Sequence, residues 1–216
     1  MHAIPGCELQ FIPNMKKLFL SLLLAVTALS AFADFRWGAT AGFNYEKFHF
    51  KQKLMQIDPS PGFSVGVIGE MMFPGIGFGI DFGMNYQMHG SKLHFGDKLV
   101  WSSEGYGTEQ SYMHILQIPI NLRFKYTRLN GLEQKIAPFV FSGPVFNINL
   151  GHNSVPPLEY SGGSIGVQCA VGAEIMRRFQ LSAGYYWGLT YEARTRKLEN
   201  FSQRPEGWQV KATCFF

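Results

Sequence analysis

The chain has 216 residues, a formal net charge of +4 and only 16% charged side chains, with 15% aromatic residues. The charge is too mild to indicate a nucleic-acid-binding protein. Beyond the N-terminal region no stretch approaches the roughly 18 apolar residues of a spanning helix, which excludes a helical membrane protein.

The N-terminal segment has the three parts of a secretory signal peptide. Two lysines after Met15 precede the apolar run Leu18–Ala28, and an Ala-x-Ala site follows it. We therefore expect residues 15–33 to be a signal peptide and residues 1–14 to be a mis-called extension upstream of the true initiator. The mature domain would be residues 34–216, which is the length of one domain.

Eight segments of this domain alternate apolar and polar residues with the period of two that a β-strand imposes. In most of them one face is aliphatic or aromatic, and the other is rich in glycine, serine, threonine, asparagine and glutamine. The predicted strands are, in chain order, 35–46, 62–73, 76–88, 111–126, 136–150, 164–176, 179–192 and 207–216.

The segment Ser111–Tyr126 shows the pattern at its fullest length. A strand of an ordinary globular protein runs to about 5–6 residues, whereas a tilted strand that crosses a bilayer needs about 9–11. Its apolar face begins at Tyr112 and ends at Tyr126, as expected if aromatic residues mark the two membrane interfaces. Pro119 falls on the polar face and lacks a donor, so we expect a local adjustment there, such as a bulge.

The segment 136–150 is less regular than the others. Gly143-Pro144 interrupts it, and the alternation slips there, so the sequence does not assign its two faces. Cys169 and Cys214 fall on apolar faces of non-adjacent strands, and we expect no disulfide between them.

The connections between the predicted strands alternate long and short, as in outer-membrane barrels with long outer loops and short periplasmic turns. The sequence thus predicts an all-β protein: an eight-stranded antiparallel up-and-down transmembrane β-barrel with a filled polar lumen. We expect it in the outer membrane of a Gram-negative bacterium, with both termini periplasmic.

Alternation alone does not say which face lies inside, and a soluble lipocalin-like barrel is the alternative. Its water-facing side would be rich in lysine and glutamate, whereas the polar faces here are mostly small or neutral, which suits a narrow interior. We therefore place the apolar faces against lipid. The residues predicted to face lipid include Phe78, Ile80, Phe82, Leu116, Ile118, Ile120, Leu122, Leu181 and Trp187.

This placement turns seven charged side chains into the lumen. They are Arg36, Glu70, Asp81, Arg123, Lys125, Glu174 and Lys211. Unpaired buried charges are costly, so we expect these groups to pair and hydrogen-bond into a network. The network could form a polar conduction path, but eight strands leave room only for side chains, which favours a plug without a large pore.

Other polar residues offer weaker candidates for a site. Five histidines in outer loops or at strand ends could bind a metal, but their spacing matches no ligand motif: His49, His89, His94, His114 and His152. Basic residues in or near the same loops could contact lipopolysaccharide phosphates, or simply be solvated: Lys51, Lys53, Lys92, Lys98, Arg194, Arg196 and Lys197. A Ser/His/acid set of a lipid-modifying enzyme could be drawn from Ser111, His114 and Glu192, although nothing in the sequence orders them.

Four stretches resemble the small outer-membrane β-barrel proteins of Bacteroidota known as the PorT-like family: Leu116–Tyr126, Ala137–Pro144, Gly172–Glu174 and Leu181–Leu189. The resemblance implies an eight-stranded barrel shaped like the OmpA and OmpX membrane domains. It implies no catalytic residues, metal or cofactor.

Three functional hypotheses follow. The first is a non-enzymatic barrel with a structural or surface-interaction role. The second is an enzyme acting on outer-leaflet lipid, and the third is an accessory component of a protein secretion system. The expected partners are outer-membrane lipid and lipopolysaccharide, the barrel-assembly machinery during insertion, and a surface or secretion-system protein.

Overall fold

The computed structural model describes residues 34–50, 56–73, 75, 77–96, 107–126, 135–153, 155, 158–195 and 202–216. The expected signal peptide and N-terminal extension lie outside these residues. The described residues contain no helix long and apolar enough to cross a membrane.

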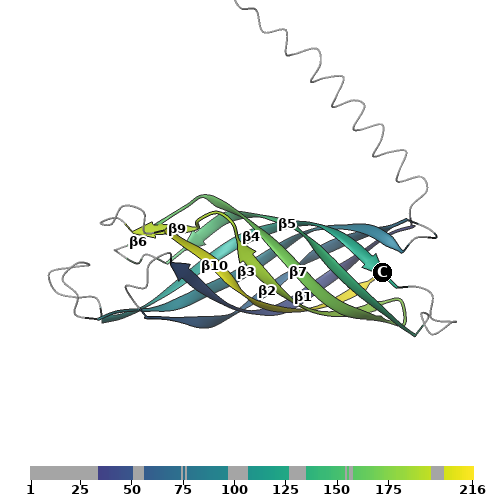
Figure 1. Cartoon of the computed structure of the whole chain (residues 1–216), viewed down its shortest axis with the longest axis horizontal. Helices are drawn as coiled ribbons and strands as arrows, with labels where there is room; N and C mark the ends of the chain where they lie inside the picture. Colours follow the sequence, from purple (N-terminus) through teal and green to yellow (C-terminus); the bar gives the residue numbers. More distant parts are fainter. Residues whose placement is uncertain are drawn as a thin grey trace, which may run out of the picture.

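Eight long antiparallel strands form a closed barrel, because β1 pairs with β2 on one side and with β10 on the other (Figure 1). The predicted eight-stranded up-and-down barrel is thereby confirmed. The strands of the wall are β1 (Asp34–Phe50), β2 (Gln56–Met72), β3 (Phe78–Gly96), β4 (Gly107–Lys125), β5 (Ile136–His152), β7 (Gly163–Ile175), β8 (Phe179–Gly188) and β10 (Ser202–Phe215).

Two short strands, β6 (Leu158–Tyr160) and β9 (Ala193–Thr195), extend the sheet from the edge of β10. Both lie at one end of the barrel, opposite the C-terminus (Figure 1). We call this end the loop end, and the opposite end, where short turns join the strands, the turn end.

The register of the sheet fixes how steeply the strands are tilted. Stepping across the register partners from Asp34 once around the barrel leads back to β1 at Asn44, ten residues further on. Such an offset belongs to strands tilted by about 40° in a barrel of this size. The path runs through Asp34, Met72, Gly79, Arg123, Phe141, Ala170, Gly184, Gln209 and Asn44.

At the loop end the strands are longer than the sequence predicted. β3 continues to Gly96 and β4 begins at Gly107, within the polar connection over 89–110 along which we expected the hairpin to continue, and β10 begins at Ser202 instead of Gly207. The strands β6 and β9 fall in segments predicted as loops. These stretches lack the apolar–polar alternation of the membrane-length strand segments. They become strands because a neighbouring strand pairs with them, which their own sequence does not indicate.

One local prediction is correct only in part, and another is wrong. Pairing is interrupted around Pro119, since the pairing with β3 skips Ile118 and Pro119 and the pairing with β5 skips Ile120 and Asn121, but the register is the same on both sides and no bulge forms. The register of β4 shifts instead at His114 and Ile115. β5 also keeps its phase through Gly143-Pro144. Its faces looked ambiguous because several of its inward residues are themselves apolar, including Phe139 and Phe141.

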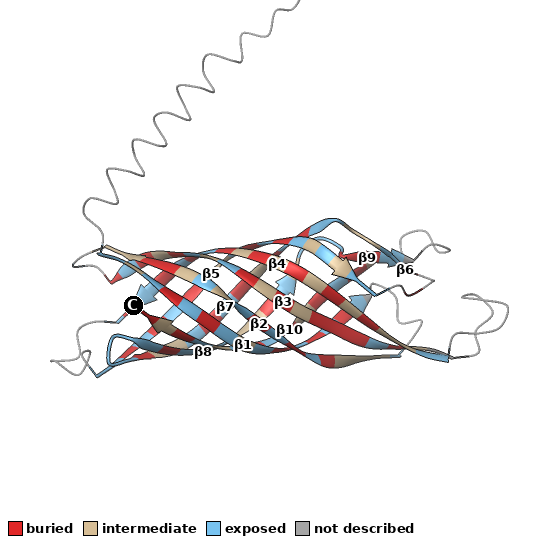
Figure 2. Cartoon of the chain, turned by 180° about the vertical axis from the view of Figure 1, so that it is seen from behind, coloured by how far each residue is buried: buried red, intermediate tan, exposed pale blue. Residues whose placement is uncertain are grey.

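The two faces of the wall lie as predicted, with alternating buried and exposed residues along each strand (Figure 2). Leu122 is 60% exposed on the outside, whereas its neighbour Arg123 is 1% exposed on the inside. All nine residues predicted to face lipid lie on the outer face, exposed or partly exposed: Phe78, Ile80, Phe82, Leu116, Ile118, Ile120, Leu122, Leu181 and Trp187.

The turn between β7 and β8 is strained. Met176 and Arg177 have positive φ angles of 52° and 58°, and the Arg178 amide donates to the Ile175 carbonyl across the turn. Two central residues with positive φ define the hairpin turn that favours Asn-Gly. The guanidinium of Arg36 donates to the Arg177 carbonyl (2.7 Å), which helps to hold this conformation.

We predict that the double substitution Met176→Asn/Arg177→Gly raises the free energy of unfolding by about 1–2 kcal/mol, because it removes the steric cost of the left-handed conformation. The Arg177 carbonyl remains available to Arg36. Urea titration of the refolded protein in detergent micelles measures the change. Met176→Val is the opposing control and should lower stability; an Asn-Gly variant no more stable than the parent would contradict this account of the turn.

Candidate functional site

Six charged side chains meet inside the barrel at its turn end, and we call them the charge cluster. Glu70 is at its centre and is fully buried. Its carboxylate contacts Arg36 Nη2 (2.7 Å), Lys125 Nζ (2.7 Å) and Arg123 Nη1 (3.0 Å). The six members are Arg36, Glu70, Asp81, Arg123, Lys125 and Glu174.

Further contacts complete the cluster. Arg123 Nε donates to Asp81 (2.7 Å), and Lys125 Nζ and Arg36 both contact Glu174. Gln180 accepts a hydrogen bond from Arg123 and donates to both Glu70 and Glu174. Three positive and three negative groups balance, so this region of the narrow bore carries no net charge.

Aromatic rings from the wall cover the two guanidinium groups of the cluster. The Arg123 guanidinium carbon lies 4.2 Å from the ring centre of Phe139 and 5.4 Å from that of Phe141. Arg36 stacks on Phe215 at 4.3 Å. Cations over aromatic faces are favourable, particularly when desolvated. The contacts of Arg123 with Phe139 and Phe141 could not be expected from the sequence, because the pattern left the faces of β5 unassigned.

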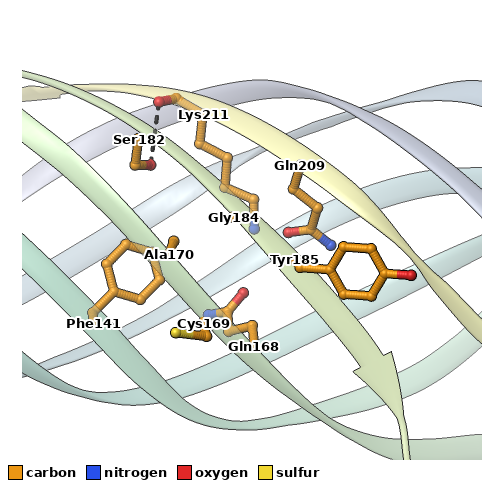
Figure 3. Close-up of a pocket in the computed structure, with 9 residues that line it drawn as sticks. All are labelled: Phe141, Gln168, Cys169, Ala170, Ser182, Gly184, Tyr185, Gln209 and Lys211. Carbon is orange, nitrogen blue, oxygen red and sulfur yellow. Dashed lines mark hydrogen bonds between the residues drawn. The ribbon is translucent and has the colours of Figure 1, made fainter.

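Lys211 does not join the charge cluster, contrary to prediction. No ion pair of its ammonium group is found among the described residues, and its side chain runs from β10 across toward Gly184 on β8 (Figure 3). It lines a small cavity of about 10 Å³ together with Gln168 and Gln209, which is room for about one water molecule. The tilt of the strands places Lys211 nearer the middle of the barrel than the cluster, beyond contact distance.

A second group of charges, which the sequence analysis did not assemble, lies toward the loop end. His89 is buried between two buried carboxylates: Nε2 is 3.0 Å from Glu192, and Nδ1 is 3.3 Å from Glu46. Glu46 also accepts from Gln87 and Gln209. The pattern did place Glu46 and Glu192 on polar strand faces, but His89 was assigned to a loop.

Glu192 ties the segment after β8 to the inside of the barrel. Besides His89, its carboxylate accepts hydrogen bonds from Ser164 (2.7 Å) and Asn147 (3.2 Å). Its backbone carbonyl accepts from Ser161 (2.7 Å), close to β6. The two short strands are therefore anchored to the wall by side chain and backbone together.

Above this group the interior becomes apolar. Six buried side chains form what we call the apolar plug: Phe48, Leu93, Met113, Ile115, Val155 and Leu158. Val155 and Leu158 come from the connection between β5 and β7, so this connection folds into the barrel. Tyr160 packs beside the plug and shares a 2.8 Å hydrogen bond with Ser111; burial raises the pKa of the Tyr160 hydroxyl, which stays protonated.

The other proposed site residues do not converge. Ser111 points inward, whereas His114 lies on the opposite face of β4 and bonds Tyr86 (2.6 Å), and Glu192 pairs with His89. His49 and His94 lie apart on the outside, whereas His152 lies opposite Met113 and stacks on Tyr160, with ring centres 3.9 Å apart. Among the described residues no three His, Cys, Asp or Glu side chains form a metal-binding group. Lys51, Lys53, Lys98, Arg196 and Lys197 lie outside the described residues.

A cavity of about 400 Å³ opens at the turn end and leads up to the charge cluster. Its lining includes Asp34, Arg36, Glu70, Lys125 and Arg177. The cavity is the open end of the bore, and the charge cluster forms its inner boundary. Inward from it, the bore is filled in turn by the cluster, neutral polar side chains, the His89 group and the apolar plug.

We predict that Arg123→Met lowers the free energy of unfolding by about 3–5 kcal/mol, because Glu70 and Asp81 would lose a buried cation. The matched control is Lys211→Met, which removes another inward-facing cation but breaks no ion pair, and should change stability by less than about 1 kcal/mol. Urea titration in micelles compares the two variants. If both variants lowered the free energy of unfolding by the same amount, the proposed difference between a charge held in ion pairs and a charge without one would be wrong.

Comparison with solved structures finds several similar chains, among them the outer membrane protein OprG. OprG from Pseudomonas aeruginosa is 10% identical, with 84% of this chain and 94% of that chain covered and a TM-score of 0.49. Neisserial surface protein A (NspA) is 13% identical, covering 83% and 97%, with a TM-score of 0.48. Ail, the attachment invasion locus protein of Yersinia pestis, solved in complex with the heparin analogue sucrose octasulfate, is 10% identical, covering 85% and 99%, with a TM-score of 0.43.

The comparison with curated proteins finds no match. The family assignment therefore comes from the sequence itself, which matches the family described as "Outer membrane protein beta-barrel domain" over residues 30–194. This match covers most of the closed, polar-lined barrel. The chain belongs to the outer membrane protein β-barrel domain family.

Proposed function

We propose that this protein is a non-enzymatic outer-membrane barrel with a structural or surface-interaction role and without a large pore. The observation that carries the proposal is a reversal of polarity along single strands. On β1, Phe43 and Tyr45 point outward and Asn44 and Glu46 inward, but two residues further on the charged Lys47 is outside and Phe48 is inside.

The inner face of β4 changes in the same way along its length. On β4, Ile120 and Leu122 are outside while Asn121 and Arg123 are inside, yet nearer the loop end Met113 and Ile115 are inside. A wall with apolar residues outside and polar residues inside is suited to a surrounding of hydrocarbon. A wall with apolar residues inside and polar residues outside is suited to water. We infer that the membrane surface lies where the polarity reverses.

The spacing of aromatic residues supports this placement. Trp37 and Tyr45 on β1 are eight residues apart, as are Phe216 and Trp208 at the end of the chain. At about 3.3 Å per residue and a tilt of about 40°, eight residues span roughly 20 Å, close to the height of an outer-membrane barrel's apolar band. The short turns and both ends of the mature chain would then be periplasmic.

The contents of the bore argue against conduction. The charge cluster fills the turn end with neutralised, mutually bonded side chains, and the apolar plug fills the loop end. An ion would have to displace both. The interior therefore serves stability, and contact with other molecules falls to the outer surfaces.

The narrower assignments remain part of the proposal and rest on sequence resemblance alone. They are the PorT-like relationship, an origin in Bacteroidota, and partners in the barrel-assembly machinery or at the cell surface. Copurification with large export components would favour an accessory secretion role instead, and altered lipid A in a deletion strain would favour an enzyme.

We predict that Ile120→Lys destabilises the bilayer-inserted protein by about 2–4 kcal/mol, because its outward side chain would lie near the middle of the apolar band. Ile148→Lys is the matched control, since both isoleucines are 45% exposed but Ile148 lies near the polarity reversal, where the cost should fall to at most about 1 kcal/mol. Unfolding titrations in lipid vesicles measure both. Equal and small effects would exclude lipid around the wall.

We predict that the purified protein in planar bilayers gives no stable, large conductance, because the bore is filled from the charge cluster to the apolar plug. Insertion is verified separately by heat-modifiable gel migration, so a silent recording is not mistaken for failed folding. Reproducible current steps of the size seen for porins would refute the closed lumen.

A further inference from the structure

The outer rim of the barrel wall is charged on β1 and β10. On six strands an outward aromatic residue lies toward the loop end: Tyr45 (β1), Phe63 (β2), Tyr86 (β3), Phe146 (β5), Trp187 (β8) and Trp208 (β10). Two positions further toward the loop end, the outward residue is uncharged on four of these strands: Pro61, Met88, Ile148 and Leu189. On β1 and β10 it is Lys47 and Glu206.

The charged residues on β1 and β10 form two adjacent cross-strand pairs. Lys47 lies opposite Glu206, and the next outward pair is His49 opposite Arg204. Because β1 and β10 close the barrel, these four side chains share one outward patch directly above Tyr45 and Trp208, which also face each other across the strands. We call this patch the rim site.

The positive groups of the rim site make only long or no ion pairs with the described residues. Lys47 Nζ and His49 Nδ1 both approach the same oxygen of Glu206, at 3.5 and 3.3 Å, and both side chains are about half exposed. Arg204 is exposed, and no ion pair of its side chain is found among the described residues. One carboxylate thus faces two permanent cations and a histidine, which leaves the rim site with a net positive charge.

The surface below the rim site is apolar and open. Phe43 is 77% exposed, and it lies opposite the exposed Val210 on β10. Hydrocarbon chains could therefore lie along the wall directly beneath the cations. An anionic group linked to acyl chains matches the whole arrangement, whereas a free anion would use only its upper part.

We propose that the rim site binds the phosphate group of an outer-leaflet glycolipid, with its acyl chains against β1 and β10. The inference rests on the proposed membrane placement and adds a specific lipid contact to it. Lys47 and Arg204 supply the attraction, since exposed lysine and arginine bind phosphate at a membrane surface, arginine through its planar fork of donors. Glu206 opposes binding and limits its strength.

The test uses the full mature protein in neutral detergent micelles, titrated with diphosphoryl lipid A and with fully dephosphorylated lipid A, and native mass spectrometry reports bound lipid. We expect preference for the phosphorylated lipid, a loss of about 30-fold in affinity for Lys47→Gln/Arg204→Gln, and tighter binding for Glu206→Gln. A purely structural Lys47–Glu206 pair would not predict the gain.

The matched control is Lys135→Gln/Arg178→Gln, which removes one lysine and one arginine that are exposed at the turn end, opposite the rim site. It should change affinity by less than about threefold. Equal losses in both double variants, or no loss in the first, would overturn the proposal. Displacement of lipid A from the parent protein by millimolar inorganic phosphate would also overturn it, in favour of a free-anion site.

Membrane insertion is measured separately from lipid binding, so the proposed function and the rim site can be refuted independently. Heat-modifiable migration and insertion into vesicles show whether each variant is folded and embedded. A parent protein that does not insert refutes the proposed function, whereas an inserted protein without phosphate-dependent lipid binding refutes only the rim site.

Discussion

The narrow bore of an eight-stranded barrel is the constraint on which the rest of the structure depends. Its interior has room for side chains but not for a bulk water column, so a charged residue that points inward must find its countercharge on another strand. Glu70 meets this demand with three cations from β1 and β4. Strands that are distant in sequence are thereby locked in register by the same contacts that neutralise the bore.

The proposed membrane placement explains why the interior is layered: its surroundings would be layered in the same way. Where hydrocarbon surrounds the wall, apolar residues are needed outside and the polar ones turn inward, and the charge cluster is the result. Beyond the polarity reversal water surrounds the wall, and the inside can pack as an ordinary hydrophobic core. The apolar plug is that core, completed by Val155 and Leu158 from a connection that would otherwise be exposed.

His89 lies at the junction of these two regions. Its imidazole ring lies between Glu46 and Glu192, and through Glu192 it links the wall to the short strands β6 and β9. Lys211, by contrast, has no contacting carboxylate among the described residues, and its side chain lines a small cavity. The bore thus contains three kinds of charged group: the charge cluster, the His89 group that anchors the short strands, and Lys211, which makes no ion pair among the described residues. Removing them should lower the free energy of unfolding by different amounts.

Much of the fold followed from the sequence, because period-two alternation over long segments fixes both the strands and the residues on each face. Leu122 outside and Arg123 inside are read directly from that pattern, and so is the strand number. Which charges touch was decided only by the tertiary structure, since the ten-residue offset around the barrel determines which inward positions reach the same level. That offset brings Arg36 to Glu174 but leaves Lys211 apart, and it joins His89 to Glu192 although they are 103 residues apart. The short strands and the plug residues Val155 and Leu158 also needed the folded chain, because they lie in segments without alternation and gain their partners only when the barrel closes.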